Sequence, residues 1–275
     1  MAKRHGKGPA FYALAAFFAV FVVFLYGPLL GVFLLSFQGP DGGLTFPMNG
    51  VSLHWFRNLF EEQLVGDFKG AFIRSLGLAL IVMCLTVVIS LLAGLAFRKR
   101  FWGQTAVFYL TVASLIVPSI LITLGIGLVF DQLDLQTSWY ASGMGAHLTW
   151  TLPFGLLIMF AVFNRFDRSV EEAARDLGAS GSQTLRHVVL PLIAPSLIGV
   201  GLFGFTLSFD EFARTLMVSG SDNTLPLELF GMTTNETTPV LYALGTATTA
   251  VSIAVIGFSL GAIAWIRRGS RGTDE

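Results

Sequence analysis

Three ionisable residues stand close together in one of the apolar stretches of this sequence. Asp210, Glu211 and Arg214 occur in LFGFTLSFDEFARTLMVSG, toward the end of that stretch. Ionisable side chains are costly in an apolar helix, so each of them is a functional candidate. The two acids could form an acidic site or gate, or they could pair with Arg214, which follows them at helical spacings of three and four residues. The sequence leaves both interpretations open.

A second group of charged residues lies in the glycine-punctuated stretch EEAARDLGASGSQTLRHVVLPL, residues 171–192. Ser169 followed by Glu172 is a capping-box pattern, which predicts the start of a helix. The next residues are good helix formers, and Gly178 suits the position just beyond a helix end. Such a helix has a face suited to a closely approaching partner, although an ordinary solvated loop helix can look the same. This face carries Ala173, Ala174 and Leu177.

A second helical piece is expected to begin near Ser180 or Ser182 and to run toward Leu190. Pro191 and Pro195 predict a break after this piece and the entry to the next long helix.

The sequence lacks the residue groupings that catalysis or metal binding requires. It contains no recognisable Ser/His/Asp grouping, no H-E-x-x-H and no G-x-x-x-x-G-K-[ST] phosphate-binding loop. Cys84 is the single cysteine, which excludes an internal disulfide and a multi-cysteine zinc site. We therefore assign no catalytic residue, metal ligand or bound cofactor to this chain.

Composition indicates which elements must position these residues. Of the 275 residues, 54% are hydrophobic and 12% are charged, and the mean hydropathy is +0.72. Soluble domains have about 25% charged residues, so an integral membrane protein is indicated. The formal net charge is zero, so overall charge says nothing about partners. For a membrane protein we expect no nucleic-acid partner.

Six apolar stretches exceed the roughly 20 residues that cross a hydrocarbon core as a helix. We therefore expect an all-α protein with six transmembrane helices near 11–37, 74–97, 104–130, 143–163, 193–216 and 241–266. The first is too long for a signal peptide, whose apolar region has about 7–15 residues. The helices form one domain, 11–266, between terminal segments 1–10 and 267–275. A long loop, 164–192, joins the fourth helix to the fifth.

Orientation follows from Lys and Arg, which are enriched in short cytoplasmic loops. Most of the 17 in this chain fall in the terminal segments, after the second helix or in the 164–192 loop. Both termini and that loop are therefore predicted to be cytoplasmic. On the outer side, His54 in an expected interfacial helix and His147 are predicted to be structural rather than ligands. The basic residues that lie outside the cytoplasmic regions are Arg57, Lys69, Arg74 and Arg214.

The charged stretch also has a fixed register that resembles a known family. Permease subunits of type I ABC importers carry a sequence pattern in one cytoplasmic loop: E-A-A, then Gly after three residues, Ile after nine more, and Leu-Pro after one more. In that family the loop joins the fourth of six helices to the fifth, which is also its predicted position in this chain. With Val188 in place of Ile, the matching residues are Glu172, Ala173, Ala174, Gly178, Leu190 and Pro191.

The resemblance implies a function and a set of partners. The segment from Glu172 to Gly178 would be a coupling helix that docks on an ATP-binding subunit, with Glu171, Leu190 and Pro191 as further coupling residues. Two such subunits, rather than this chain, would bind ATP and Mg²⁺. A second permease, similar or identical, would form the other half of the solute path, and an external solute-binding protein would deliver the cargo. The chain would lie in a bacterial inner membrane, surrounded by lipid.

The resemblance also bears on the cargo. The segments SFDEF and NTLPL resemble the spermidine/putrescine branch of these permeases. Two acids at an outer mouth suit a cation, whereas Arg214 beside them opposes that attraction. Relatives that carry thiamine, ferric iron, opines or phosphonates are the alternatives within the family. Outside it, the alternative is an ion-gradient-driven secondary transporter, which would normally show broken helices and charges nearer the midplane.

Overall fold

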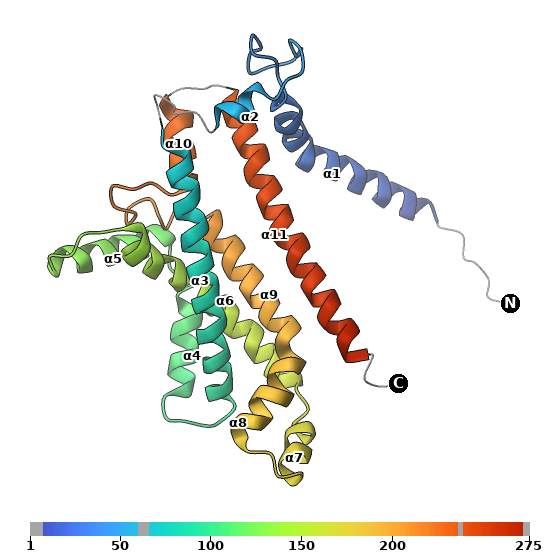
Figure 1. Cartoon of the computed structure of the whole chain (residues 1–275), viewed down its shortest axis with the longest axis vertical. Coiled ribbons are helices and arrows are strands. Elements are labelled where there is room, and N and C mark those ends of the chain that lie inside the picture. The colour runs from blue at the N-terminus through green and yellow to red at the C-terminus, as the bar shows by residue number, and fades with distance from the viewer. Residues whose placement is uncertain (1–7, 60–65, 236–238, 272–275) are drawn as a thin grey trace. The chain divides into compact units, whose positions relative to one another are not determined.

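The structure is a computed structural model of the chain and describes residues 8–59, 66–235 and 239–271. The regular elements in these ranges are helices, and an isolated antiparallel β-bridge joins Gln38 to Val51. The all-α fold expected from the sequence is confirmed (Figure 1). The ends of both predicted terminal segments, 1–7 and 272–275, lie outside the described residues.

The chain divides into two compact units, Met1–Gly66 with Met232–Val251, and Asp67–Gly231 with Ser252–Glu275. The first unit contains α1, Pro9–Leu35, and the start of α11, Val240–Arg271. Pro9 is the first residue of α1. Its missing N–H costs no hydrogen bond there, because the first N–H groups of a helix have no partner within the helix. The side chains of α1 are apolar and mostly exposed, as in a helix that is surrounded by lipid or by other membrane helices.

The first unit also contains a loop closed around a buried glutamine. The side chain of Gln38 donates to the Gly43 carbonyl at 3.1 Å and accepts from the Asn49 N–H at 2.7 Å. The short helix α2, His54–Asn58, follows this loop. It corresponds to the expected interfacial helix, and Asn58 Nδ2 lies 3.1 Å from His54 Nε2.

Three long helices form the centre of the second unit and pack side by side (Figure 1). Small residues let their backbones approach closely. A Cβ placed on Gly94 would lie 2.9 Å from the Phe163 ring. A buried hydroxyl pair also joins two of the helices, with Thr86 Oγ1 donating to Thr151 Oγ1 at 2.8 Å. The three helices are α3, Phe68–Phe97; α6, Met144–Arg165, preceded by the π-helix η1, Trp139–Gly143; and α9, Leu190–Phe209.

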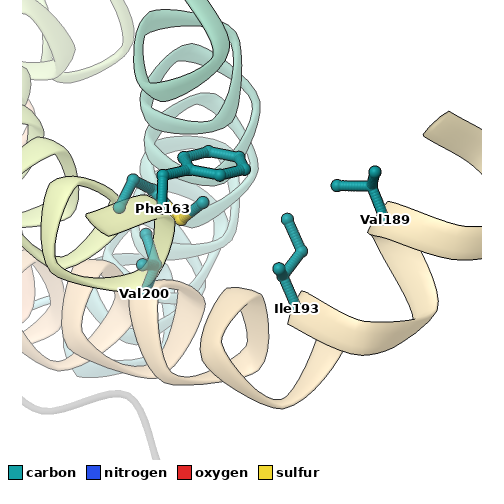
Figure 2. Packing of buried hydrophobic residues seen from close by; sticks show 5 residues of the cluster. Phe163, Val189, Ile193 and Val200 are labelled. Carbon is teal, nitrogen blue, oxygen red and sulfur yellow. The ribbon is translucent and has the colours of Figure 1, made fainter. Parts of the chain in front are cut away.

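A cluster of buried apolar side chains joins the end of α6 to the start of α9. Figure 2 shows Phe163 with Val189, Ile193 and Val200, and Met159 completes the cluster. Dispersion contacts are small singly and large in sum, so this cluster fixes how the two helices meet.

The third predicted helix, 104–130, is two helices in the structure. They are α4, Gln104–Ala113, and α5, Ser119–Gln132, and they run in different directions in Figure 1. Pro118 explains the break, because it has no N–H to donate and disfavours helical backbone at the preceding Val117. Five described helices are long and apolar enough to cross a membrane, so the count of six long helices is not confirmed.

The fifth predicted helix begins earlier and ends sooner than expected. It is a continuous rod of α8, Gly181–Thr184, the π-helix η2, Leu185–Val189, and α9. The predicted break at Pro191 is wrong, because the wider π-helical turn just before α9 accommodates a residue without an N–H. The rod ends at Phe209 instead of 216. The helix α10, Leu225–Asn235, was not predicted.

Candidate functional site

The helix α7, Ser169–Asp176, forms within the 164–192 loop. Its N-terminal cap differs from the predicted one, because Arg168 occupies the cap position and Ser169 is already helical. The predicted capping box between Ser169 and Glu172 is therefore wrong by one position. Asp167 Oδ1 instead accepts a hydrogen bond from Ser169 N at 2.9 Å, and this bond lowers the pKa of the Asp167 carboxyl.

A capping box does form eleven residues further along, at the start of α8. Ser180 N donates to Gln183 Oε1 at 2.8 Å, and Gln183 N donates to Ser180 Oγ at 3.4 Å. The second helical piece that was expected to begin near Ser180 is confirmed.

Gly178 ends α7 in the left-handed conformation, with φ of +87°. The Ala179 N–H donates to the Ala174 carbonyl at 3.0 Å, and the Gly178 N–H donates to the Arg175 carbonyl at 2.8 Å. These two bonds form a Schellman motif, in which glycine is favoured because other residues are strained at positive φ. The glycine stop expected from the sequence is therefore present.

The solvent-facing surface of α7 carries most of the E-A-A-x-x-x-G pattern. Glu172 and Ala173 are exposed, and Ala174 is half-buried. Leu177, which caps the helix, is 91% exposed. A fully exposed leucine beside small side chains is a surface that a protein partner can cover.

Leu190 and Pro191 lie in a different part of the loop, in the first turn of α9. Leu190 packs against the buried cluster of Figure 2, whereas Pro191 is exposed. These two residues of the pattern therefore lie where the loop joins α9, away from the exposed surface of α7.

Glu171 points inward, unlike its neighbours on α7. The residue is 8% exposed, and its carboxylate lies 2.5 Å from the guanidinium of Arg98, just after α3. Arg98 in turn lies over the rings of Phe163 and Phe166. Arg175 is 3.8 Å from the other carboxylate oxygen. Sequence reasoning placed Arg98 and Glu171 in separate loops and could not pair them.

A cavity of about 580 Å³ lies beside this ion pair. It is lined by the end of α3, by one face of α7 and by the start of the α8–η2 rod, and its charged lining includes Lys99, Arg168 and Glu172. Open space therefore separates α7 from much of the helical body above it.

The structure divides the predicted acidic cluster. Because α9 ends at Phe209, Asp210, Glu211 and Arg214 lie in the turns that follow it. Glu211 pairs with Arg214, with 3.5 Å between carboxylate and guanidinium, and also accepts from Arg214 N at 2.9 Å. Asp210 is exposed and makes no ion pair within the described part of the chain. Pairing thus engages Glu211 and leaves the Asp210 carboxylate accessible.

Arg214 is the buried member of this cluster, at 3% exposure. Its guanidinium carbon lies 4.3 Å from the centre of the Trp150 ring on α6, a favourable cation–π distance. Nothing in the sequence indicates this partner, because residues 150 and 214 are brought together only by the packing of α6 beside the turns after α9.

His147 of α6 is buried against the end of α9 and the turns that follow it. Its ring nitrogens lie 2.8 Å from Ser208 Oγ and 2.9 Å from Thr215 Oγ1. The expectation of a satisfied histidine is confirmed, although the side chain is buried within the helices.

Comparison with known proteins identifies the family. The model of the binding-protein-dependent transport system inner membrane component matches residues 86–269, more than half of the chain. The chain belongs to this family. It is 31% identical to the spermidine/putrescine transport system permease protein PotC of Haemophilus influenzae, covering 90% of this chain and 95% of that protein. It is 30% identical to the putrescine transport system permease protein PotI of Escherichia coli, covering 88% and 85%.

Solved structures support the fold of this permease. A bacterial ABC transporter that imports the acidic polysaccharide alginate matches with a TM-score of 0.68 at 14% identity, covering 94% of this chain and 95% of that chain. The inward-facing MetNI methionine ABC transporter matches with a TM-score of 0.56 at 16% identity, covering 72% and 94%. The fold is therefore that of an ABC importer permease.

The family assignment settles the class of function. The chain is a permease subunit of an ABC importer and not an enzyme. It is a multi-pass protein of the inner membrane, and the ion-gradient-driven secondary transporter is set aside.

Proposed function

We propose that this permease is driven through α7 by separate ATP-binding subunits and that it imports a polyamine or another small cation. The observation that carries the proposal is the exposed surface of α7, which bears the E-A-A-x-x-x-G pattern and ends in a Schellman turn at Gly178. Because the surface is small and nearly smooth, a groove on another protein can approach it closely.

Each residue of the pattern has a role in this proposal. Glu172, Ala173 and Ala174 contact the ATP-binding subunit, and Gly178 provides the sharp turn that presents them. Leu190 and Pro191 fix the root of the loop where α9 begins. Two ATP-binding subunits hold ATP and Mg²⁺, and their closure moves α7.

The proposed membrane orientation places the 164–192 loop and both termini in the cytoplasm. Contacts at the two ends of α3 support it. At one end Arg98 meets Glu171, and at the other Arg74 Nε donates to the Asn223 carbonyl at 2.7 Å. Each contact joins segments that the Lys and Arg distribution assigns to the same side. We retain 11–266 as the membrane domain.

The remaining partners follow from the class of transporter. A second permease, similar or identical, forms the other half of the path, and an external solute-binding protein delivers the cargo. The family description names binding-protein dependence, and the related alginate transporter has been solved with its periplasmic protein bound. Alternating access then requires rigid helices and a docking surface rather than catalytic side chains.

A polyamine is the cargo that the comparisons favour, because both curated relatives described above are named for polyamines. The exposed Asp210 carboxylate suits an ammonium group. Glu211 and Arg214 shape the same region, since each offsets the charge of the other. Thiamine, iron, opine and phosphonate remain the alternative cargoes.

The coupling role is tested by Gly178→Asp, with Gly181→Asp as the matched control. A Cβ meets open space at both glycines, but only Gly178 ends the proposed docking surface of α7, where an added carboxylate would face the ATP-binding subunit. We expect Gly178→Asp to abolish uptake by the reconstituted transporter with normal membrane insertion, and Gly181→Asp to retain at least half. Normal uptake by Gly178→Asp would disprove the role given to Gly178.

The cargo is tested by competition. Proteoliposomes that contain the transporter and its binding protein are given labelled putrescine with excess spermidine, thiamine, ferric iron, an opine or a phosphonate. We expect only the polyamine to compete. Absence of putrescine uptake by an otherwise ATP-hydrolysing transporter would contradict the polyamine assignment and leave the coupling role intact.

A further inference from the structure

Glu171 is the buried charged side chain of α7. Its side chain is 11% exposed, against 61% for Arg175, while Glu172 and Asp176 are both exposed. A carboxylate is costly to bury unless a cation pairs with it. The Arg98 guanidinium, 2.5 Å from Glu171 Oε1, supplies that cation from the end of α3.

Arg98 is itself held by other elements. Its side chain is 16% exposed, and its guanidinium carbon lies 5.1 Å from the centre of the Phe163 ring and 5.6 Å from that of Phe166. Phe163 belongs to the buried cluster that joins α6 to α9 (Figure 2). One ion pair therefore connects α7 to the ends of α3 and α6 and, through Phe163, to the start of α9.

The space around this ion pair is open. The 580 Å³ cavity is bounded by Leu95 and Ala96 of α3, by α7, and by Thr184 and Leu185 of the α8–η2 rod. Apolar side chains do not fill the gap between α7 and α3, so the attachment of α7 to α3 depends on the charged pair that spans it. A short charge-assisted contact of this kind is stronger and more geometrically specific than a neutral hydrogen bond.

We propose that the ion pair between Glu171 and Arg98 transmits movement of α7 to α3 and α6, so that Glu171 positions the coupling helix and does not itself dock on the ATP-binding subunit. This inference rests on the coupling role proposed for α7. It separates two tasks within one short helix, because Glu172, Ala173 and Ala174 face outward while Glu171 faces the helical body.

The discriminating substitution is Glu171→Gln. Glutamine has nearly the same shape but no charge, so it leaves Arg98 without its counter-ion and weakens the attachment. Arg175→Gln is the matched control, since Arg175 also lies near Glu171 but at 3.8 Å and in solvent. The charge exchange Glu171→Arg with Arg98→Glu tests whether the pair itself is what matters.

The measurement uses the complete transporter, with ATP-binding subunits, partner permease and binding protein, in proteoliposomes. For Glu171→Gln we expect the ATP-binding subunits to co-purify as in the wild type, and the ratio of ATP hydrolysed to cargo imported to rise at least tenfold. Arg175→Gln should stay within twofold of the wild-type ratio. The exchanged pair should lower the ratio at least threefold relative to Glu171→Gln.

Three outcomes would overturn the inference. They are an unchanged ratio in Glu171→Gln, an exchanged pair no better coupled than the single variant, and loss of the ATP-binding subunits from Glu171→Gln, which would make Glu171 a docking residue. A failed coupling role is distinguishable from all three, because Gly178→Asp would then import cargo normally. Melting of each purified complex separates loss of coupling from loss of folding.

Discussion

His147 on α6 lies within hydrogen-bonding distance of residues on both sides of the point where α9 ends, Ser208 within the helix and Thr215 in the turns beyond it. His147 therefore helps to hold these turns against α6, together with the contact between Arg214 and Trp150. The same turns carry Asp210, Glu211 and Arg214, so the geometry of this charged cluster depends on a buried histidine that makes no contact with its carboxylates in the described structure.

Replacing His147 by alanine should destabilise the permease. The change leaves the hydroxyls of Ser208 and Thr215 without their partner, and each unsatisfied buried group costs about 1–3 kcal/mol. The melting temperature of the detergent-solubilised protein measures the effect. His187→Ala is the control, because His187 is exposed and should change the melting temperature little. Equal melting of both variants would contradict the bridging role.

Close approach of α3 to α6 predicts that Gly94→Val is destabilising. The Phe163 ring and Met159 Cβ already lie 2.9 and 3.0 Å from where a Cβ would stand, so overpacking should cost about 1–3 kcal/mol. Gly257→Val makes the same chemical change in α11 at a site with open space. Thermal unfolding should separate the two variants, and an unaffected Gly94→Val would show that the helices are further apart than described.

Strain at Gly178 predicts a graded series. Alanine at a left-handed φ costs about 1 kcal/mol, and asparagine costs less because it tolerates that conformation. We expect Gly178→Ala to weaken retention of the ATP-binding subunits about fivefold and Gly178→Asn to have a smaller effect. Titration of ATP-binding subunit against immobilised permease measures this, and the reverse order would refute the backbone explanation.

Neutralising Asp210 should affect cargo uptake, whereas neutralising Glu211 should affect the stability of the protein. Asp210→Asn removes an exposed carboxylate and should raise the cargo concentration for half-maximal uptake about tenfold with no change in melting temperature. Glu211→Gln leaves Arg214 buried without its counter-ion and should destabilise the protein by roughly 3 kcal/mol. If Asp210→Asn has unchanged uptake kinetics, Asp210 does not contact the cargo.

Acid should weaken the start of α3 through Asp67. The Gly70 N–H bonded to Asp67 Oδ1 at 2.9 Å, with Arg74 at 3.2 Å, holds the pKa of this carboxyl below its ordinary value. A lowered pKa means that its stabilising effect is complete above about pH 4 and is lost as the pH falls further. Asp67→Asn retains the cap without the charge, so its melting temperature should fall less than that of the wild type below about pH 4.

Several features were predictable because each depends on one continuous segment. The helical class and the approximate helix positions follow from apolar length, and the Gly178 stop follows from the backbone freedom of glycine. The register from Glu172 to Pro191 also identified the family that the comparisons show. The errors in this group also have local causes. Pro118 divides one apolar stretch into two helices, and a π-helical turn lets another helix continue through Pro191.

Tertiary structure alone decided which charges meet. The sequence contained Glu171 and Arg175 at a helical spacing, but the shorter contact is to Arg98, 73 residues earlier in the chain. The sequence also has two acids close to Arg214. In the folded chain Arg214 forms its ion pair with Glu211 and stacks on the Trp150 ring, while Asp210 stays exposed. Periodicity determines which face of a helix a side chain occupies, whereas its partner depends on how separate helices pack, and that depends on many side chains at once.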